Sequence, residues 1–421
     1  MALPPLSDTT VSSHFFEPVI RVFNRLTTSR QCSELSDLEF ITLGVSRVLS
    51  QATSGRDFLQ AYADSGHQQV GTGHFFETLK SQRRLGLCAE LNELLQQEVA
   101  KVRDDPFAAF PELAGFDIHA GDGHYHGAAA HDKPIGDAKR PVGHFFMFNL
   151  RSCALHHLEL GEAGEQRKHE HDMRVLKRTA IKTLRRGAGK GRKVLVVWDR
   201  AGIDFQYWAH AKQNSVYFIS RQKDNMRLEI IGINAFERSD PRNQGVISDE
   251  LVSTSTGVYV RRVVYHDPVD DVTYTYLTSE TRLPPGLVAL IYKRRWDIEK
   301  AFDETENKLQ EGKAWASSPT AKKIQGQLIA ITFNLLLLIE VELEKAEQIH
   351  NTPAIHRRIK RMEEIRARLA KIGATIPFVF SAIQRITQRG LKLIRWLRNH
   401  LYGERPWSES LGQLRRLYAA L

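Results

Sequence analysis

The stretch VLVVWD at residues 194–199 decides the fold class, because five consecutive apolar residues lead directly into an acid. A continuous run of this kind, rich in β-branched residues, is typical of a strand that is covered on both faces. FDIHAGDG (116–123), GHFFMFNLRS (143–152) and ALHHLEL (154–160) look like further strands, and the basic segment 168–188 has a helical period. Strands, a helix and a buried strand in this order indicate an α/β layer.

The segment after this layer has a different pattern. Residues 215–281 are β-patterned throughout, and GVYVRRVVYH and DVTYTYLTS flank a turn at residues 267–271. Two prolines then open one long predicted helix over residues 284–310, and helical patterns continue to the end of the chain. We therefore expect an α/β domain that is interrupted by an all-β insertion.

The first part of the chain is predicted to be a helical domain over residues 1–108, because apolar residues recur at intervals of three and four. Ser36 is the expected N-cap of one of these helices. Residues 54–84 resemble two short helices, a glycine turn and a third helix that ends in Arg83 and Arg84. A helix-turn-helix would place such a basic helix in a DNA groove. An ordinary helical bundle has the same periodicity, so both interpretations stay open.

The charge balance points to a polyanionic partner. The chain has 421 residues, 42% of them hydrophobic and 26% charged, which argues against disorder and against a fibrous protein. Its 59 Lys and Arg outnumber 49 Asp and Glu, for a net charge of +10. Residues 341–421 hold 16 basic against 7 acidic residues, which leaves 43 against 42 in the rest. The C-terminal region is therefore expected to provide much of the contact with this partner.

The cysteines and the apolar runs bear on the compartment. Cys32, Cys88 and Cys153 are far apart in the sequence, which argues against a disulfide framework and against a thiolate zinc site. The longest apolar run, residues 328–339, is shorter than the ~18–20 residues that a bilayer span needs. The N-terminus also lacks the pattern of a signal peptide. We expect a soluble protein of a reducing cytosol, without a membrane partner.

Three carboxylates occupy positions that suit metal chemistry. Asp122 stands at the end of a predicted strand, with a glycine on either side that leaves space near its carboxylate, and Asp199 closes the buried strand. Strand ends are where ligand sites form in α/β sheets. Glu299 lies on the predicted long helix, on the same face as Tyr292 and Arg295. Mg²⁺ prefers carboxylate oxygens, and a two-metal site can activate a water or a 3′-hydroxyl for attack on a phosphodiester.

Each of these residues also has a plainer interpretation. A strand-end Asp beside Gly is often only a turn former, and a helical Glu often pairs with a basic residue one turn away. For Arg295 a phosphate contact is favoured over a salt bridge to Glu299, because its planar guanidinium suits bidentate binding. For Tyr292 a phosphate contact and core packing stay equally open. Asp117 and Asp204 are expected to lie outside the site.

A histidine cluster near the first acid offers a different metal chemistry, that of a zinc hydrolase. The histidines fall in what is predicted to be a Gly- and Ala-rich loop, whereas metal-binding histidines usually lie on rigid elements, so zinc is the less favoured alternative. The residues concerned are His119, His124, His126, His131 and the neighbouring Asp132.

Four sequence blocks carry a family resemblance. They are DGHYHGAAAHD (122–132), VWDRAGID (197–204), YFISRQKD (217–224) and YKRRWDIEKAFDETENKLQ (292–310), followed by a predicted helix over 324–344. They resemble the DDE transposases of bacterial insertion sequences, in the insertion-sequence-four branch with its Y-R-E-K signature. The resemblance covers roughly residues 110–345, and the spacing of the last block is its most specific part.

The resemblance implies a fold and a catalytic triad. The expected α/β fold is a ribonuclease-H-like catalytic core over residues 109–214 and 282–345, with the β insertion at 215–281. An N-terminal helical domain (1–108), with possible DNA binding, and a basic C-terminal helical region (346–421), for DNA contact or dimerisation, flank this core. Asp122, Asp199 and Glu299 would be the catalytic, metal-binding residues, holding two Mg²⁺ ions that Mn²⁺ can replace.

The resemblance also implies DNA contacts. Tyr292 and Arg295 match the signature and would bind DNA near the cleavage site. The position of the signature lysine is taken by Glu306, so the nearest replacement is Lys308, two residues further on, with Lys300 as another lysine nearby. Two residues correspond to about 200° around a helix, so Lys308 would meet the phosphate only if the helix bends.

The function implied is that of a cut-and-paste DNA transposase. Such a protein binds inverted-repeat ends, cleaves them with Mg²⁺ and joins the 3′-hydroxyls to target DNA, with a possible hairpin intermediate. Its partners would be double-stranded DNA and a second copy in a synaptic homodimer, in the nucleoid of the bacterial cytoplasm. Two alternatives stay open: a DNA-binding regulator or domesticated derivative that does not cut, and a nuclease of the same fold that does not join strands.

Overall fold

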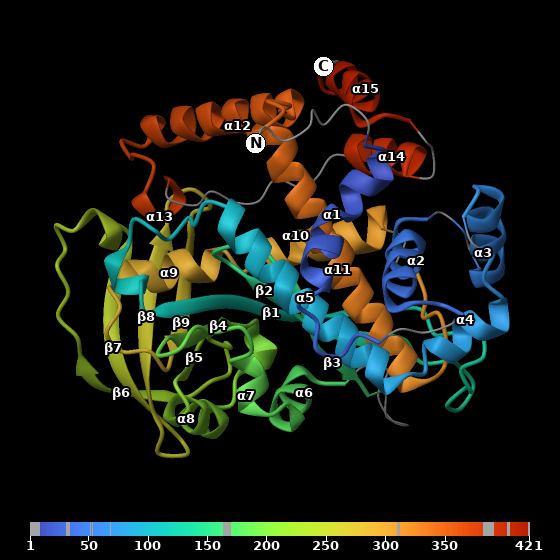
Figure 1. The fold of residues 1–421 in the computed structure, drawn as a ribbon. Coiled ribbons are helices and arrows are strands. Elements are labelled where there is room, and N and C mark those ends of the chain that lie inside the picture. The colour runs from blue at the N-terminus through green and yellow to red at the C-terminus, as the bar shows by residue number, and fades with distance from the viewer. Residues whose placement is uncertain are drawn as a thin grey trace.

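Nine strands form one mixed sheet in the computed structural model (Figure 1). They lie side by side in the order β3-β2-β1-β4-β5-β9-β8-β7-β6. Their bounds are β1 Phe116–His126, β2 Val142–Asn149, β3 Leu155–Gly161, β4 Lys193–Val197, β5 Val216–Arg221, β6 Leu228–Ile233, β7 Val246–Thr254, β8 Tyr259–Asp267 and β9 Val272–Thr278. The structure describes residues 9–30, 34–50, 52, 54–67, 69–162, 170–309, 312–381, 391–401 and 405–419.

The middle of the sheet contains the strand that the run at 194–199 predicts, and the structure shows that its pairing is parallel. β4 is parallel to both β1 and β5, whereas the remaining neighbours are antiparallel. The side chains of residues 194–197 in β4 are fully buried. A strand with both faces covered favours such an uninterrupted apolar run. The prediction of a buried strand in an α/β layer is therefore confirmed.

The β-patterned segment 215–281 extends this same sheet. β5 pairs with β4 on one side and with β9 on the other. β9, β8, β7 and β6 then follow as an antiparallel meander, with β6 at the outer edge. The β-rich segment and the α/β strands thus share one continuous hydrogen-bonded ladder.

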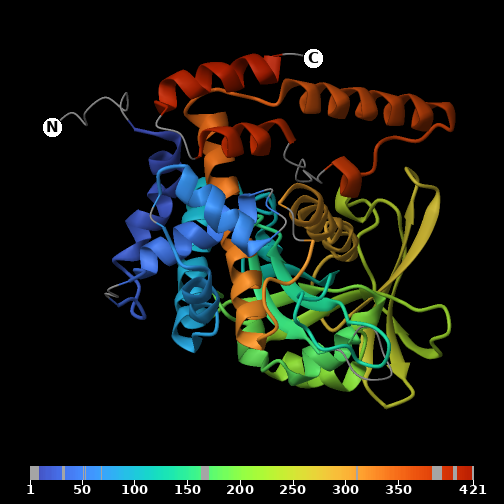
Figure 2. The ribbon, with the colours of Figure 1, turned by 90° about the vertical axis from the view of Figure 1, so that its right-hand side faces the viewer.

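Helices cover both faces of the sheet (Figure 2). One face packs against α5 (Gln82–Val102), α9 (Pro285–Lys293), α10 (Trp296–Lys308) and α11 (Pro319–Lys345). The opposite face packs against α6 (Asp172–Arg178), α7 (Ile181–Leu184) and α8 (Phe205–Gln213). Each face of the sheet has its own buried apolar cluster. The sheet and its two helical layers therefore enclose two hydrophobic cores.

The predicted helix over residues 284–310 is two helices, and this prediction is wrong in that respect. α9 ends at Lys293 and α10 begins at Trp296. Arg294 lies in the break, buried, with its guanidinium 2.9 Å from the carboxylate of Asp297. This ion pair is local, since its two residues are three positions apart, and it links the break to the first turn of α10.

The long helix α11 runs through the centre of the helical layer, where 19 of its 27 residues are buried. Within the described parts of the chain it is the one helix long and apolar enough to cross a membrane, and 94% of its most apolar window is buried inside the protein. Asn334 interrupts its apolar run for a structural reason. The side-chain amide of Asn334 donates to Asn92 of α5 (2.7 Å) and to the backbone carbonyl of Leu155 in β3 (2.8 Å). One buried amide thus joins two helices and a strand.

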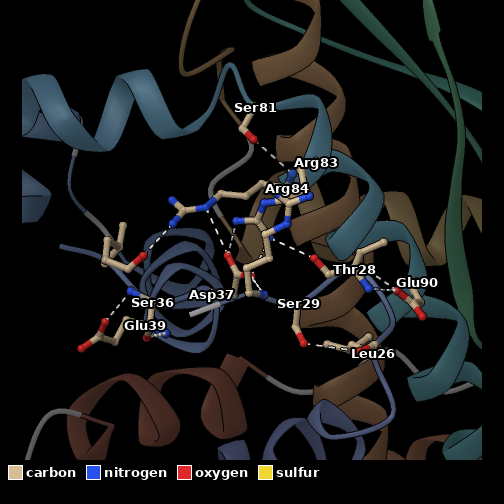
Figure 3. A network of polar contacts seen from close by, with 12 residues as sticks. Leu26, Thr28, Ser29, Ser36, Asp37, Glu39, Ser81, Arg83, Arg84 and Glu90 are labelled. Atoms are coloured by element: carbon tan, nitrogen blue, oxygen red, sulfur yellow. Dashed lines mark hydrogen bonds and ion pairs between the residues drawn. The ribbon is translucent and has the colours of Figure 1, made fainter. Parts of the chain in front are cut away.

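The N-terminal helices are α1 (Val11–Phe23), α2 (Asp37–Leu49), α3 (Gly55–Asp64) and α4 (Thr72–Thr78), followed by α5. Ser36 caps α2 through a reciprocal capping box with Glu39, which confirms the predicted N-cap. Arg83 and Arg84 do not end a third helix as predicted, since they lie in the first turn of α5. Their guanidinium groups hold the buried carboxylate of Asp37 in a network that Figure 3 shows. These two arginines therefore fasten α5 to α2.

The C-terminal helices are α12 (Thr352–Lys371), α13 (Phe378–Ser381), α14 (Leu391–His400) and α15 (Trp407–Ala419). They return to the start of the chain, where Trp407 stacks on His14 with ring centroids 3.9 Å apart. Figure 1 shows α14 and α15 beside α1 for this reason. Cys88 and Cys153 are buried free thiols, and Cys32 lies outside the described residues.

Candidate active site

The two strand-borne acids meet where the parallel pairing of β1 and β4 stops. The last parallel pair is Ala120 with Val197, and Asp122 and Asp199 each lie two residues beyond it. β1 does not end at Asp122 as predicted, because it continues to His126 in antiparallel pairing with β2. The two acids therefore share one end of the parallel ladder, and Asp199 follows β4 directly.

The local backbone fixes both carboxylates. Asp122 accepts a hydrogen bond from the amide of Gly123 (2.8 Å). Asp199 caps the short 3-10 turn η3 (Arg200–Gly202) by accepting from the amide of Ala201 (2.7 Å). The hydroxyl of Ser220 in β5 also donates to the backbone carbonyl of Asp199 (2.7 Å). Each acid is thus oriented by its own turn or strand before any ligand binds.

The glycines around Asp122 have a purpose other than the predicted one. A Cβ atom at Gly121 would collide with the ring of Trp198, and a Cβ atom at Gly123 would collide with the ring of Phe145. Both rings belong to the buried cluster on the opposite face of the sheet. The two glycines therefore make room for aromatic packing behind Asp122, rather than for space at its carboxylate.

Glu299 reaches the site from α10, which packs over β1 and β2. Arg295, directly before α10, links it to the first acid. Its guanidinium lies 3.3 Å from an oxygen of Asp122 and 2.5 Å from an oxygen of Glu299. The side chain of Arg295 is 10% exposed, that of Asp122 is 21% exposed and that of Glu299 is 30% exposed, so solvent reaches the two carboxylates. The structure therefore brings Asp122, Arg295 and Glu299 together, and the salt bridge considered in the sequence is present.

Tyr292 lies beside this group and also packs in the core. Its ring is 4.8 Å from that of Tyr276 in β9, and the guanidinium of Arg295 lies 5.9 Å from its centroid. Burial raises the pKa of the Tyr292 hydroxyl, although Arg295 opposes this effect. The spacing of seven residues does place Tyr292, Arg295 and Glu299 side by side, despite the break between α9 and α10.

The electrostatic field of the site favours a cation. Burial raises the pKa of Asp122 to about 7, the guanidinium of Arg295 opposes this shift, and the charges of Asp199 and Asp172 increase it. Burial also raises the pKa of Asp172, to which the charge of Asp199 contributes. The carboxylates of Asp122, Asp172 and Asp199 therefore repel one another at this end of the sheet. The positive charge of Arg295 favours the ionised form of Asp122 and so lowers its pKa.

Asp172 is a residue of this site that the sequence did not reveal. It begins α6, and its carboxylate accepts a hydrogen bond from the indole of Trp198 (2.8 Å). In the sequence it follows His171 at the start of a basic segment, and no spacing or motif relates it to the other acids. Only the fold places this carboxylate behind Asp199.

The residues suit a divalent metal ion by donor type and by charge. Carboxylate oxygens are the ligands of hard cations, and an added positive charge would relieve the repulsion that raises the pKa of Asp122. Over the described ranges, no three Asp, Glu, His or Cys side chains converge into a ready-made metal cage. Arg295 occupies an oxygen of Asp122 and one of Glu299 instead. Asp122, Asp199 and Glu299 are the residues whose donor type fits a metal ion, and Arg295 holds two of them.

The lysine expected near this site is only partly described. Lys308 is the last residue of α10, and its side chain lies outside the described part of the chain. Glu306, at the signature position, is exposed. Lys300 lies 3.6 Å from the carboxylate of Asp297, on the same helix.

Three of the four histidines near Asp122, His119, His124 and His126, lie in β1 and not in a loop, so that prediction is wrong for them, whereas His131 lies in an exposed turn. His124 and His126 belong to β1 and are buried, and burial lowers the pKa of each to about 4. His119 lies on the opposite side of the strand, 6.0 Å from the ring of His156. The neighbouring Asp132 pairs with Lys322 (2.9 Å). Nothing in the described ranges assembles these groups into a zinc site.

The two acids expected to lie outside the site have structural partners. Asp117 lies on β1, five residues before Asp122, and its carboxylate pairs with Arg192 (2.8 Å). Asp204 caps α8 and forms an ion pair with Lys177. Both carboxylates therefore form ion pairs away from Asp122, Asp199 and Glu299.

Comparison with known proteins shows the family to which this chain belongs. Residues 125–335, half of the chain, match the family described as "Transposase DDE domain". The matched span contains Asp199, Tyr292, Arg295 and Glu299, and it begins three residues after Asp122. "Putative transposase y4zB" of Sinorhizobium fredii is 23% identical over 146 residues, which cover 33% of this chain and 41% of the relative. The match thus spans less than half of that relative's length.

Proposed function

Because the chain belongs to the family of transposase DDE domains, we propose that it is a DNA transposase that cleaves the inverted-repeat ends of its own element and joins them to target DNA. Transposition by DNA cleavage and strand transfer is what the family implies. The observation that carries the proposal is the meeting of Asp122, Arg295 and Glu299 beside Asp199, at the end of the only parallel strands in the described sheet.

The proposal assigns parts of the fold to the family's architecture. The strand order β3-β2-β1-β4-β5, with β4 parallel to both neighbours, would be a ribonuclease-H-like core. The meander β6–β9 would be the insertion before the third acid. The spacing of Tyr292, Arg295 and Glu299 favours the insertion-sequence-four branch with its Y-R-E-K signature. The expected domain boundaries at residues 108, 214, 281 and 345 belong to this proposal as well, with one change: β5 (Val216–Arg221) pairs with β4 and would count with the core.

Asp122, Asp199 and Glu299 would hold the divalent ions, two Mg²⁺ that Mn²⁺ could replace. When bound, such ions activate the attacking water or 3′-hydroxyl and stabilise the leaving oxygen of an in-line displacement. Asp122 lies within β1, Asp199 directly follows β4 and Glu299 lies on α10, so three separate elements would provide the ligands.

Arg295 would position the DNA strand. Its guanidinium already lies between two carboxylates, and its fork geometry suits a phosphate oxygen pair equally well. Asp122, Asp199 and Glu299 would hold the cations, and the guanidinium of Arg295 would then be available to hold the scissile phosphate. Tyr292 stands beside Arg295 and would contact the same strand, and Lys308 at the end of α10 would provide a further phosphate contact.

Binding of double-stranded DNA, both the ends and the target, would rest largely on the basic C-terminal region. α12 presents Arg357, Arg358 and Arg361 on its exposed surface. Strand transfer needs two ends held together, so a homodimer would form the synaptic complex, and the ends would pass through a hairpin intermediate. The place of action would be the nucleoid in the bacterial cytoplasm.

The decisive experiment is cleavage of the DNA that flanks the gene, where inverted repeats are expected. The Asp199→Ala variant should lose Mg²⁺-dependent cleavage and strand joining, while its DNA affinity stays unchanged. Asp117→Ala is the matched control, because it removes an acid from the same sheet that pairs with Arg192 outside the site. This control should cleave as the unmodified chain does.

Three outcomes would revise the proposal. Cleavage that survives Asp122→Ala, Asp199→Ala and Glu299→Ala alike would overturn the triad. Cleavage without any joined product would instead support a nuclease of the same fold. DNA binding without cleavage by the unmodified chain would support a non-cutting regulator.

A further inference from the structure

We propose that Asp172 and Trp198 form a positioning pair, which fixes the relative placement of Asp122 and Asp199 from the opposite face of the sheet. This inference rests on the proposed function, since it concerns the placement of the same metal-binding acids. Neither residue would touch metal or DNA, and both would act through the strands that carry the acids.

Trp198 is wedged behind both acids. It directly precedes Asp199, and its ring lies in the buried cluster on the face of the sheet that α6, α7 and α8 cover. The ring lies where Cβ atoms of Gly121 and of Gly202 would collide with it. Gly121 directly precedes Asp122, and Gly202 ends the turn that Asp199 caps. One indole therefore contacts the backbone next to each acid.

Asp172 fixes the orientation of this indole. Its carboxylate accepts the Nε1–H of Trp198 at 2.8 Å. Two other buried indoles are satisfied by backbone carbonyls, Trp208 by Gly202 (3.0 Å) and Trp396 by Ser410 (2.9 Å). A neutral carbonyl would thus have been sufficient for packing alone. At Trp198 the acceptor is instead a carboxylate in a field of like charges, which is unfavourable for ordinary core packing.

The segment that carries Asp172 is tied to both acid-bearing strands. The hydroxyl of Tyr125, three residues after Asp122 on β1, donates to the backbone carbonyl of Glu170 (2.8 Å). Asp172 binds Trp198 at the end of β4, and α6 packs against η3, the turn after Asp199. Residues 170–172 therefore join the end of β1 to the end of β4 behind the site.

The pair would set the separation of the two carboxylates. Two ligands from neighbouring strands bind one ion well only if their backbones are held at a fixed distance, and outer contacts that orient ligands typically change metal affinity 10- to 100-fold. If the indole loses its partner, the ring can rotate, and the strand ends on either side are no longer held by the same wedge. Mn²⁺ affinity should then fall without any change to a ligand.

The test is Mn²⁺ binding by the full chain without DNA, measured by isothermal titration calorimetry. Trp198→Phe keeps most of the ring but removes the N–H, and it should weaken Mn²⁺ binding by roughly tenfold or more. Trp396→Phe is the matched control, because it removes the hydrogen bond of another buried indole, in the C-terminal helices. The control should lower the melting temperature but leave Mn²⁺ affinity as it is.

Substitutions of Asp172 separate orientation from charge and guard against misfolding of Trp198→Phe. Asp172→Ala should weaken Mn²⁺ binding as Trp198→Phe does. Asp172→Asn retains an oxygen for the indole N–H and should restore affinity to within about threefold. If Asp172→Asn binds Mn²⁺ as weakly as Asp172→Ala does, Asp172 acts by its charge, and the positioning role is overturned. Unchanged Mn²⁺ affinity in Asp172→Ala and Trp198→Phe would overturn it too.

The same titration distinguishes failure of this inference from failure of the proposed function. If Asp199→Ala binds Mn²⁺ as tightly as the unmodified chain, the metal site itself is misassigned. If Asp199→Ala abolishes binding and Asp172→Ala has no effect, only the positioning pair is refuted.

Discussion

The substitution Asp122→Asn should make the metal-free protein more stable at pH 8. Burial raises the pKa of Asp122 to about 7, whereas an unperturbed aspartate has a pKa near ~3.9. Between these two values the folded chain holds a proton that the unfolded chain has released, so the free energy of unfolding falls as the pH rises. A displacement of about three pH units at roughly 1.4 kcal/mol each amounts to about 4 kcal/mol, lost in full above pH 7.

Asparagine avoids this loss because it does not ionise. Its side-chain oxygen can still accept the hydrogen bond from the Gly123 amide, and Arg295 keeps its contact with Glu299. The free energy of unfolding should therefore exceed that of the unmodified protein by about 2–4 kcal/mol at pH 8. At pH 4, where Asp122 is protonated in the folded chain, the two proteins should be nearly equal.

Urea unfolding followed by tryptophan fluorescence, in EDTA at pH 4, 6 and 8, measures this difference. Asp117→Asn serves as the control, because Asp117 has its own cation in Arg192 and should gain nothing. Addition of Mn²⁺ at pH 8 should stabilise the unmodified protein and leave Asp122→Asn unaffected. An Asn variant that is no more stable than the unmodified protein at pH 8 would refute the account of a partly buried carboxylate that its acidic neighbours repel.

Three further predictions concern the scaffold and the basic surface. Asn334→Leu should lower the free energy of unfolding by about 1–3 kcal/mol, because it leaves buried polar groups without partners, and an unchanged urea midpoint would contradict the role of this amide. Asp37→Ala should lower it by about 3–5 kcal/mol, since two arginines at the start of α5 lose their carboxylate; a small loss in the same assay would count against this network. Replacement of Arg357, Arg358 and Arg361 by Gln should reduce the slope of log affinity against log salt for DNA by up to ~3, from about 0.9 per phosphate contact, and an unchanged slope would exclude α12 from the interface.

Local patterns in the sequence predicted the parts of the fold that depend on local physics. The run at 194–199 gave a buried strand because an uninterrupted apolar run is stable only with both faces covered. Ser36 was predicted as an N-cap because its hydroxyl satisfies a free amide of the same helix. The seven-residue spacing from Tyr292 to Glu299 predicted their proximity to Arg295, although the single helix on which that prediction rested is broken between α9 and α10.

Long-range contacts account for what the sequence did not predict. Arg83 and Arg84 read as the basic end of a helix, but Asp37, which lies 46 residues before Arg83, places them at the start of one. Asp172 is 27 residues before Asp199, and only the packing of α6 against η3 brings it behind the site. Periodicity carries no information about such pairs, because they arise when separate elements pack.

The continuity of the sheet limits how this protein can be shortened. β9 covers one side of β5 through pairs at Ile219, Ser220 and Arg221, so the β-rich segment is not a cassette that can be cut out cleanly. Excision of β6–β9 would turn β5 into an open edge, and its apolar residues would invite pairing with other chains. A minimal derivative therefore has to keep β9, or a designed strand in its place, if it is not to aggregate.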